Sequence, residues 1–271
     1  MSDESLAPNN AVPTSRRELL RAAGLAGATA LVAAWSGRAA FAADPAAAAA
    51  VADGPTDGAS QFASVPGRNI NEKVLNFALT LEILEADLYR QAVNIAAGQP
   101  KDAPLSSNPG SYRRKASTGG LSTKLADVGF LYLVQFAYIE AAHRDFLRNA
   151  IQSGGGTPVV RNPGGYKFPQ APQPTIKDLL TKILPLEETG VRAYLGALPY
   201  LTDLGLATVA GGIFSTEARH SAAVATNLGL DAGPRQLPGD QKVTPEYPSP
   251  NTFEYFLKPK TVLTAATAFF A

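Results

Sequence analysis

The sequence predicts an all-α protein whose core is a four-helix bundle. Four segments carry apolar residues at the spacing of one helix face, and capping residues or glycines mark most of their ends. The only two histidines each follow a glutamate by three positions, which is a helical spacing. The helices are expected at about 72–97, about 122–152, from Thr175 onward, and at about 203–228.

The first two helices have clear end signals. Asn69 or Asn71 can cap the first helix, and Gly98 ends it. The second is apolar almost all round between Val128 and Ile139, so we expect it to be buried on most sides. Three glycines starting at Gly154 stop it.

The second half of the predicted bundle is less regular. Residues 154–174 are rich in glycine and proline and predict a long crossover that returns the chain to the opposite end of the bundle. Thr175 and Asp178 form a capping pattern for the third helix, which Pro185 is expected to kink or restart. In the fourth helix, Gly211-Gly212 costs about 1 kcal/mol per residue against alanine. Close helix packing or the approach of the backbone to a site would explain this pair.

The N-terminus has the features of an export signal, expected at residues 1–42. Residues 15–21 resemble the twin-arginine motif, an apolar run covers 22–35, and Ala40-Phe41-Ala42 is a small-x-small cleavage site. The run of about 14 residues is short for a membrane span of about 20, although an uncleaved anchor is the alternative. We expect a periplasmic or secreted protein with no stable membrane anchor after cleavage.

The rest of the chain divides by composition. Residues 43–68 lack periodicity and are expected to be a flexible linker, 69–230 the bundle, and 231–271 a Pro-rich tail with a short C-terminal helix. A net charge of +1 without a basic run argues against a nucleic-acid partner. The absence of cysteine excludes disulfides and thiolate ligands. The oligomeric state stays open, a homo-oligomer included.

The two histidines carry the chemical signal. Glu140 and His143, like Glu217 and His220, share one face of a helix and direct a carboxylate and an imidazole at the same spot. This Glu-x-x-His element is typical of a dinuclear metal site in a four-helix bundle, which needs one further glutamate from each of the other two helices.

The other two helices repeat a second pattern, Leu-Glu-x6-Tyr. Glu82 precedes Tyr89 by seven residues, and Glu187 precedes Tyr194 by the same distance. Seven residues are two helical turns, so each tyrosine is expected on the face of its own glutamate. The shared spacing favours Glu82 and Glu187 as the two further ligands.

Several assignments stay open at this point. Glu85 lies one turn after Glu82, and Glu188 lies next to Glu187, so either is an alternate ligand. Tyr89 and Tyr194 are candidates for hydrogen bonds to the ligands or for radical chemistry, with ordinary core packing as the alternative.

Electrostatics favours a metal over a purely structural interpretation. A carboxylate on an apolar helix face loses hydration worth several kcal/mol unless it is paired. Two divalent cations would balance four glutamates beside neutral imidazoles. The alternative is ordinary ion pairing of Glu140 with Arg144 and of Glu217 with Arg219 or a neighbour.

These motifs resemble the ferritin-like domain proteins, specifically the exported group related to desiccation-associated proteins. The resemblance covers about residues 69–230 and rests on Leu81-Glu82-x-x-Glu85-Ala86-x-x-Tyr89, Glu140-x-x-His143, Leu186-Glu187-x6-Tyr194 and Glu217-x-x-His220. It implies an antiparallel bundle with a di-iron or di-manganese centre. In that centre Glu140 and Glu217 would bridge the two ions, His143 and His220 would each bind one, and Glu82 and Glu187 would be terminal ligands.

The resemblance leaves three functions to compare. The first is an oxidoreductase, ferroxidase-like or catalase-like, that reacts with O2 or H2O2 in oxidative or desiccation stress. The second is a non-catalytic, metal-stabilised protein of envelope stress. The third, ranked last because of the linker and tail, is iron storage in a cage. Fold analogy supports the site better than the reaction.

Overall fold

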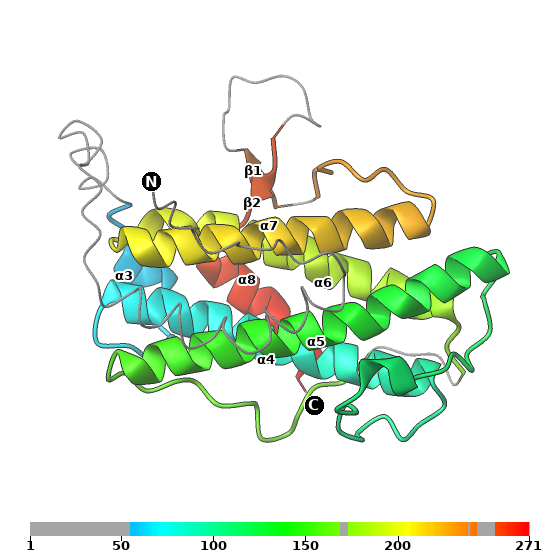
Figure 1. Cartoon of the computed structure of the whole chain (residues 1–271). Coiled ribbons are helices and arrows are strands. Elements are labelled where there is room, and N and C mark those ends of the chain that lie inside the picture. Colours follow the sequence, from blue (N-terminus) through cyan, green and yellow to red (C-terminus); the bar gives the residue numbers. More distant parts are fainter. Residues whose placement is uncertain (1–54, 169–172, 238, 243–252, 271) are drawn as a thin grey trace, which may run out of the picture. The chain divides into compact units, whose positions relative to one another are not determined.

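The computed structural model contains four long helices that lie side by side in one bundle (Figure 1). They are α4 (Ile70–Ala96), α5 (Thr123–Ser153), α6 (Ile176–Ala197) and α7 (Leu204–Asn227). The structure describes residues 55–168, 173–237, 239–242 and 253–270, so the export signal expected at 1–42 lies outside the described residues. The all-α fold class is confirmed.

Polar side chains begin each long helix. The side chain of Asn69 caps α4, that of Ser122 caps α5 and that of Asp203 caps α7, each by accepting a bond from a first-turn backbone N–H. Thr175 and Asp178 form the reciprocal capping box of α6. These contacts satisfy N–H groups that have no partner within the helix, which is why the helices begin at these residues.

The crossover between α5 and α6 runs along α4 and sets the direction of the helices. In Figure 1, α4 and α7 point one way, and α5 and α6 point the other. The buried amide of Asn76 donates to the carbonyl of Thr157 and accepts from the N–H of Val159, and Gln91 donates to the carbonyl of Tyr166. The expected crossover to the opposite end of the bundle is thus present, held to α4 by buried side-chain amides.

The helix breakers differ in part from what the sequence predicts. Of the two alternatives for Pro185, a kink or a restart, the restart is wrong, because α6 is one continuous element on both sides of it. Gly211 and Gly212 mark no close approach, since a Cβ built on either would meet nothing within 4 Å. A close approach occurs instead at Gly129 of α5, where a Cβ would lie 2.7 Å from a methyl of Leu180.

The segment just before the bundle is more ordered than the sequence indicates. Residues 43–68 were expected to be a flexible linker, but the described part contains the one-turn helix α3 (Gly58–Gln61) and the fully buried Phe62. The Phe62 ring packs edge-on against Phe77 and Tyr200, with centroid distances of 5.6 and 5.2 Å. A single aromatic residue in a Gly- and Ala-rich stretch gives no periodic signal, which explains why the order within residues 55–68 could not be predicted.

The chain after α7 returns to the bundle. Strands β1 (Gln241–Lys242) and β2 (Tyr255–Phe256) pair antiparallel, and α8 (Pro259–Ala266) packs against α4 and α6 with Val262 fully buried. The strand pair was not predicted, since two residues are too few to show an alternating pattern. The 3₁₀ turns are η1 (Pro109–Ser111), η2 (Leu198–Tyr200) and η3 (Thr267–Phe269).

Helix α5 is long and apolar enough to cross a membrane if length and hydropathy alone are considered. The central helix of a water-soluble bundle has the same properties. In this structure α5 packs against α4, α6 and α7 and carries the fully buried Glu140, which fits a core helix.

Candidate metal centre

Four buried glutamates, one from each long helix, face one place in the core of the bundle. They are Glu82 of α4, Glu140 of α5, Glu187 of α6 and Glu217 of α7, and each is 0% exposed. Glu82 and Glu140 have apolar neighbours along their helices, so burial of the apolar face carries these two carboxylates inside as well. Burial costs a carboxylate several kcal/mol unless it is paired, so this arrangement requires positive charge nearby.

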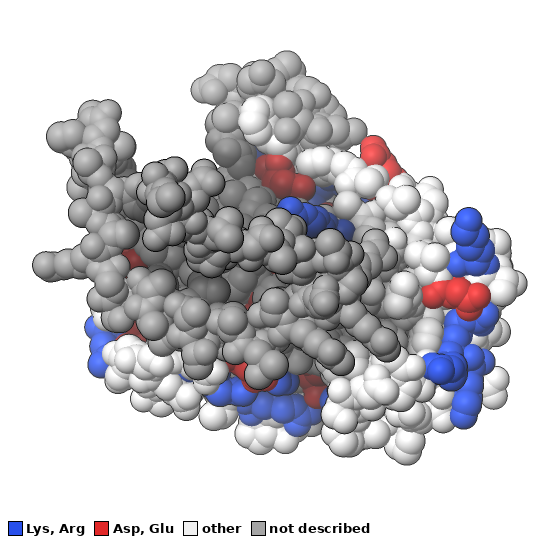
Figure 2. Space-filling view, viewed as in Figure 1, with Lys and Arg blue, Asp and Glu red and all other residues white. Residues whose placement is uncertain are grey.

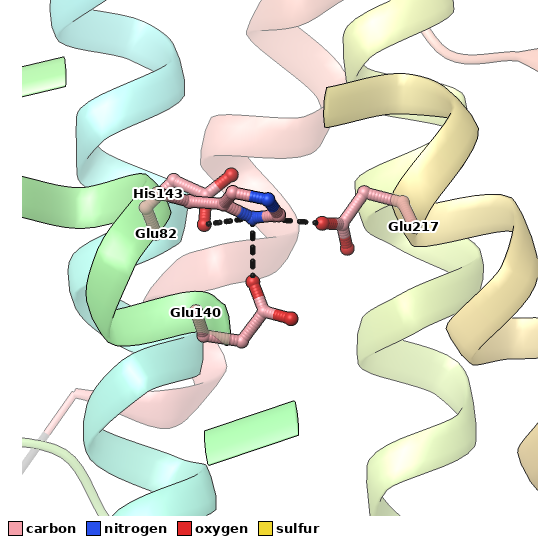
Figure 3. A group of neighbouring side chains, drawn as sticks. All are labelled: Glu82, Glu140, His143 and Glu217. Atoms are coloured by element: carbon pink, nitrogen blue, oxygen red, sulfur yellow. Dashed lines mark hydrogen bonds and ion pairs between the residues drawn. The ribbon is translucent and has the colours of Figure 1, made fainter. Parts of the chain in front are cut away.

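His143 stands among three of these carboxylates. Its Nδ1 lies 3.1 Å from an oxygen of Glu140, 3.4 Å from one of Glu217 and 3.5 Å from one of Glu82. Figure 3 shows the three carboxylates, which come from three different helices, around this single ring nitrogen. The spacing of three residues places Glu140 and His143 on the same face of α5, as the sequence predicts.

His220 occupies a matching place on the other side of Glu140. Its Nδ1 lies 2.8 Å from Glu140 Oε1 and 3.5 Å from Glu187 Oε2. The ring of Phe136 stacks on the imidazole with a centroid distance of 3.8 Å and an interplanar angle of 22°. Glu140 therefore lies between the two imidazoles, and Phe136 restricts the orientation of one of them.

The six side chains form two overlapping groups that could each hold a metal ion. The first group is Glu82, Glu140, His143 and Glu217, and the second is Glu140, Glu187, Glu217 and His220. Within each group the candidate ligand atoms lie within 4.8 Å of one another. Only Glu140 and Glu217 belong to both groups, so these two carboxylates lie between the two positions.

Unsatisfied atoms in the core show that these residues fit metal ions. Among the described residues, no hydrogen bond reaches Glu82 Oε2, Glu187 Oε2 or either carboxylate oxygen of Glu217. The close contact between His220 Nδ1 and Glu140 Oε1 also lacks hydrogen-bond alignment. Buried polar atoms are normally paired. Oxygen and nitrogen lone pairs that converge without partners are what a metal ion needs.

The carboxylates have strongly perturbed pKa values for a clear physical reason. Burial, aided by the charge of Glu140, raises the pKa of Glu82 to about 7. Burial and neighbouring carboxylates also raise the pKa of Glu187, and they raise that of Glu217 well above its usual range. Glu140 is the exception, because the two histidines outweigh the effect of burial and lower its pKa to about 2. Without metal, the site must therefore hold protons.

The histidines hold some of these protons. Burial lowers the pKa of each ring, but the neighbouring carboxylates reverse this effect and raise the pKa of His143 to about 12 and that of His220 to about 9. Both rings are therefore cations at neutral pH when no metal is bound. A metal that binds at Nδ1 has to displace these protons, so metal and protons compete for the same site.

Each of the two tyrosines binds the glutamate of the other tyrosine's helix. The hydroxyl of Tyr89 on α4 donates to Glu187 on α6, and that of Tyr194 on α6 donates to Glu82 on α4, the second at 2.5 Å. The sequence places each tyrosine on the face of its own glutamate, but periodicity along one helix does not show which neighbouring helix supplies the partner. Each hydrogen bond holds one oxygen of the carboxylate in place. The second oxygen is left free to face the other ligand candidates, so the bonds orient both carboxylates.

The structure shows that the two alternate ligands named from the sequence, Glu85 and Glu188, lie outside the two ligand groups. Glu188 points away from the group and binds Arg192 at 2.6 Å, Ser221 at 2.8 Å and Arg235 at 3.0 Å. Glu187 therefore belongs to the group of ligand candidates, and Glu188 does not. Glu85 is buried beside the group, but it belongs to neither set of ligand atoms.

The ordinary ion pair proposed for Glu140 is absent from the described residues. Arg144 binds its neighbour Asp145, with Nε 2.8 Å from a carboxylate oxygen, and forms no ion pair with Glu140. Asp145 also binds Arg148 at 2.9 Å. Arg219, the partner suggested for Glu217, is exposed to solvent, whereas Glu217 is fully buried.

One important residue, Gly190 of α6, was missed in the sequence. A Cβ built on it would lie 2.9 Å from Glu217 Oε2 and 3.2 Å from Glu85 Oε1. Gly190 therefore leaves the space that the carboxylate of Glu217 occupies. Its position three residues after Glu187, on the same helix face, is the signal that could have identified it.

Comparison with known proteins agrees with this geometry. A comparison with curated proteins found none with significant similarity. The family model described as "Ferritin-like domain" matches residues 71–230, which is more than half of the 271 residues and contains all six ligand candidates. The chain therefore belongs to the ferritin-like domain family.

Proposed function

We propose that the protein holds two divalent metal ions, iron or manganese, in the core of its bundle. Glu140 and Glu217 would be shared by both ions. Glu82 and His143 would complete the first ligand set, and Glu187 and His220 the second. The observation that carries this proposal is that the two ligand groups overlap at Glu140 and Glu217 and nowhere else.

The donor set supports the choice of metals. Each ion would have carboxylate oxygens and one imidazole, which suits iron and manganese, and cysteine is absent from the chain. Four carboxylates and two divalent ions sum to zero charge once the imidazoles are neutral. Electrical balance is required in a place where the carboxylates are fully buried.

We further propose that the centre reacts with O2 or H2O2, as an oxidoreductase of ferroxidase-like or catalase-like type. Two bound ions would supply one electron each, which with two protons would reduce O2 to H2O2 or H2O2 to two waters. In a catalase-like cycle, a second H2O2 would return the two electrons and two protons and leave as O2. Tyr89 and Tyr194 hold the two terminal carboxylates through their hydroxyl groups. The surrounding apolar core keeps bulk water away, which strengthens electrostatic interactions within the site.

The protein is also proposed to work outside the inner membrane, where it would meet oxidative or desiccation stress. The support is Arg16-Arg17, the short apolar run and the Ala40-Phe41-Ala42 site in the sequence. Replacing both arginines with lysine should keep the precursor in the cytoplasm, as fractionation with an antibody would show. Normal export of the double variant would refute this part of the proposal.

The surface charges offer no argument for a nucleic-acid partner. On the described part of the face in Figure 2, basic and acidic side chains are intermixed among uncharged ones. The chain has 24 basic and 23 acidic residues, so no long-range field favours a polyanion.

The test of the function compares metal-loaded and chelator-stripped protein. Protein purified from its own host is analysed for iron and manganese, then mixed with O2 or H2O2 while the oxidation of the metal and the loss of oxidant are followed. We expect about two metals per chain and a reaction that the stripped protein lacks. Two bound metals without reaction would favour the non-catalytic stress protein, and large metal-filled assemblies would favour iron storage.

A further inference from the structure

An apolar pocket lies at one side of the proposed centre, between the four long helices and the turn η2. Its walls are apolar side chains together with the ring of Tyr194. The only hydroxyl among the lining side chains, that of Tyr194, is already bound to Glu82 at 2.5 Å. The free space suits a molecule of about the size of water or dioxygen.

The pocket is adjacent to the ligand candidates on three helices. Ala78 of α4, Leu147 of α5 and Ile213 of α7 line it, and each lies four positions from a ligand candidate on its own helix. These ligand candidates are Glu82, His143 and Glu217, respectively. Four positions correspond to about 6 Å along a helix, so the pocket lies one turn from the metal position that contains His143.

The chemistry of the walls decides which small molecule the pocket favours. Water and hydrogen peroxide both lose hydrogen bonds on entering an apolar space. The free energy lost with these bonds exceeds the free energy gained from van der Waals contacts with the walls. Apolar lining favours apolar guests such as xenon over water, because the walls offer water no hydrogen bonds. Dioxygen is small, apolar and needs no hydrogen bond, so it is the oxidant that matches these walls.

We propose that this pocket collects dioxygen beside the metal centre, which makes O2 rather than H2O2 the oxidant that the protein is built to receive. This inference rests on the proposed function. Tyr194 connects the two parts, because its ring forms a wall of the pocket while its hydroxyl holds a metal-binding carboxylate.

The first measurement uses xenon, an unreactive apolar probe, on the wild-type protein. Crystals pressurised with xenon should show one xenon atom between Ala78, Leu147 and Ile213, with or without metal in the centre. Absence of xenon from this place would overturn the proposal. This readout does not depend on the reaction of the metal-loaded protein.

The second measurement fills the pocket. Ala210 of α7 lines it, whereas Ala222 of the same helix does not, and both are partly buried. Ala210→Leu should exclude xenon and slow oxidation of the loaded centre by O2 about tenfold, because a few added carbons in an apolar pocket have effects of this size. Reaction with H2O2 should stay within about twofold, and the control Ala222→Leu should change neither rate. Ala78→Val serves as a second filling variant if Ala210→Leu does not fold.

The outcomes separate this proposal from the function on which it rests. An O2 rate that is equal in wild type and in a folded, xenon-excluding Ala210→Leu protein overturns the role of the pocket and leaves the metal function intact. Xenon binding in a loaded wild-type protein that reacts with H2O2 but not with O2 also overturns it. A loaded protein that reacts with neither oxidant refutes the proposed function itself.

Discussion

Replacing Gly190 with alanine should weaken metal binding without unfolding the bundle. The new methyl carbon would lie 2.9 Å from Glu217 Oε2, whereas ordinary contact begins at 3.4 Å. The carboxylate of Glu217 would then have to move by roughly 0.5 Å, the difference between these two distances. Metal–ligand distances tolerate only about 0.2 Å. Because Glu217 is one of the two carboxylates proposed to serve both ions, one methyl group perturbs both positions.

The expected loss of metal affinity follows from the effects of comparable changes near metal ligands. Disturbing a group that orients a metal ligand typically lowers affinity by about 10- to 100-fold, or roughly 1.4–2.7 kcal/mol. In the metal-free protein, alanine gains about 1 kcal/mol of helix propensity over glycine, which offsets part of an overpacking cost of about 1–3 kcal/mol. The melting temperature of the metal-free variant should therefore stay close to that of the wild type, while its metal affinity falls.

The assay is calorimetric titration of chelator-stripped protein with Mn²⁺, or with Fe²⁺ under anaerobic conditions. Gly212→Ala is the matched control, since it is the same change in a helix at a place where the new methyl group meets nothing within 4 Å. It should bind metal like the wild type and be more stable by up to about 1 kcal/mol. Unchanged affinity in Gly190→Ala would refute the reasoning, because Glu217 would then have no role that depends on its position.

Three further predictions concern the ligands and their protons. Tyr194→Phe removes the donor to Glu82 and should lower the affinity for one of the two ions by about tenfold, with two ions still bound at saturation. Titration with metal checks this, and affinities equal to those of the wild type would contradict it. Glu187→Gln should lose metal affinity while Glu188→Gln keeps two ions per chain, as metal analysis would show, and the reverse result would exchange their roles. In the metal-free protein the pKa of Glu82 is raised to about 7 from 4.5, mainly by burial, and that of His220 to about 9 from 6.5, by carboxylates acting against burial. The stability that each group contributes is complete below its ordinary pKa and is lost as pH rises through its raised pKa. The melting temperature of the metal-free protein should therefore fall from pH 5 to 9. Over the same range, the increase in melting temperature on metal binding should grow. Scanning calorimetry with and without chelator measures both, and a pH-independent increase would contradict the competition between metal and protons.

Much of the bundle could be predicted from local signals. Caps at Asn69, Ser122, Thr175 and Asp203 fixed where the long helices begin, because unpaired N–H groups at a helix start need these side chains. The Gly- and Pro-rich stretch 154–174 predicted the crossover for a similar local reason. Most of what the sequence did not predict was non-local, such as the burial of Phe62 against α4 and the pairing of two-residue strands.

For the site too, contacts within one helix could be predicted from the sequence, whereas contacts between helices could not. The spacing within one helix placed Glu140 beside His143, because positions three apart share a face. Spacing could not show that Tyr89 would bind Glu187, since that contact joins residues 98 positions apart. It also could not exclude Glu188, which differs from Glu187 only by a rotation of about 100° around the helix and finds its partners on other segments.

Counting metals per chain in three proteins tests the central claim most directly. The proteins are the wild type, Glu140→Ala, which removes a carboxylate common to both ligand groups, and Glu85→Ala, which removes a buried carboxylate that belongs to neither. After loading and removal of free metal, the account predicts about two ions in the wild type and in Glu85→Ala, and loss of the pair in Glu140→Ala. Two ions retained in Glu140→Ala, or both lost in Glu85→Ala alone, would contradict it.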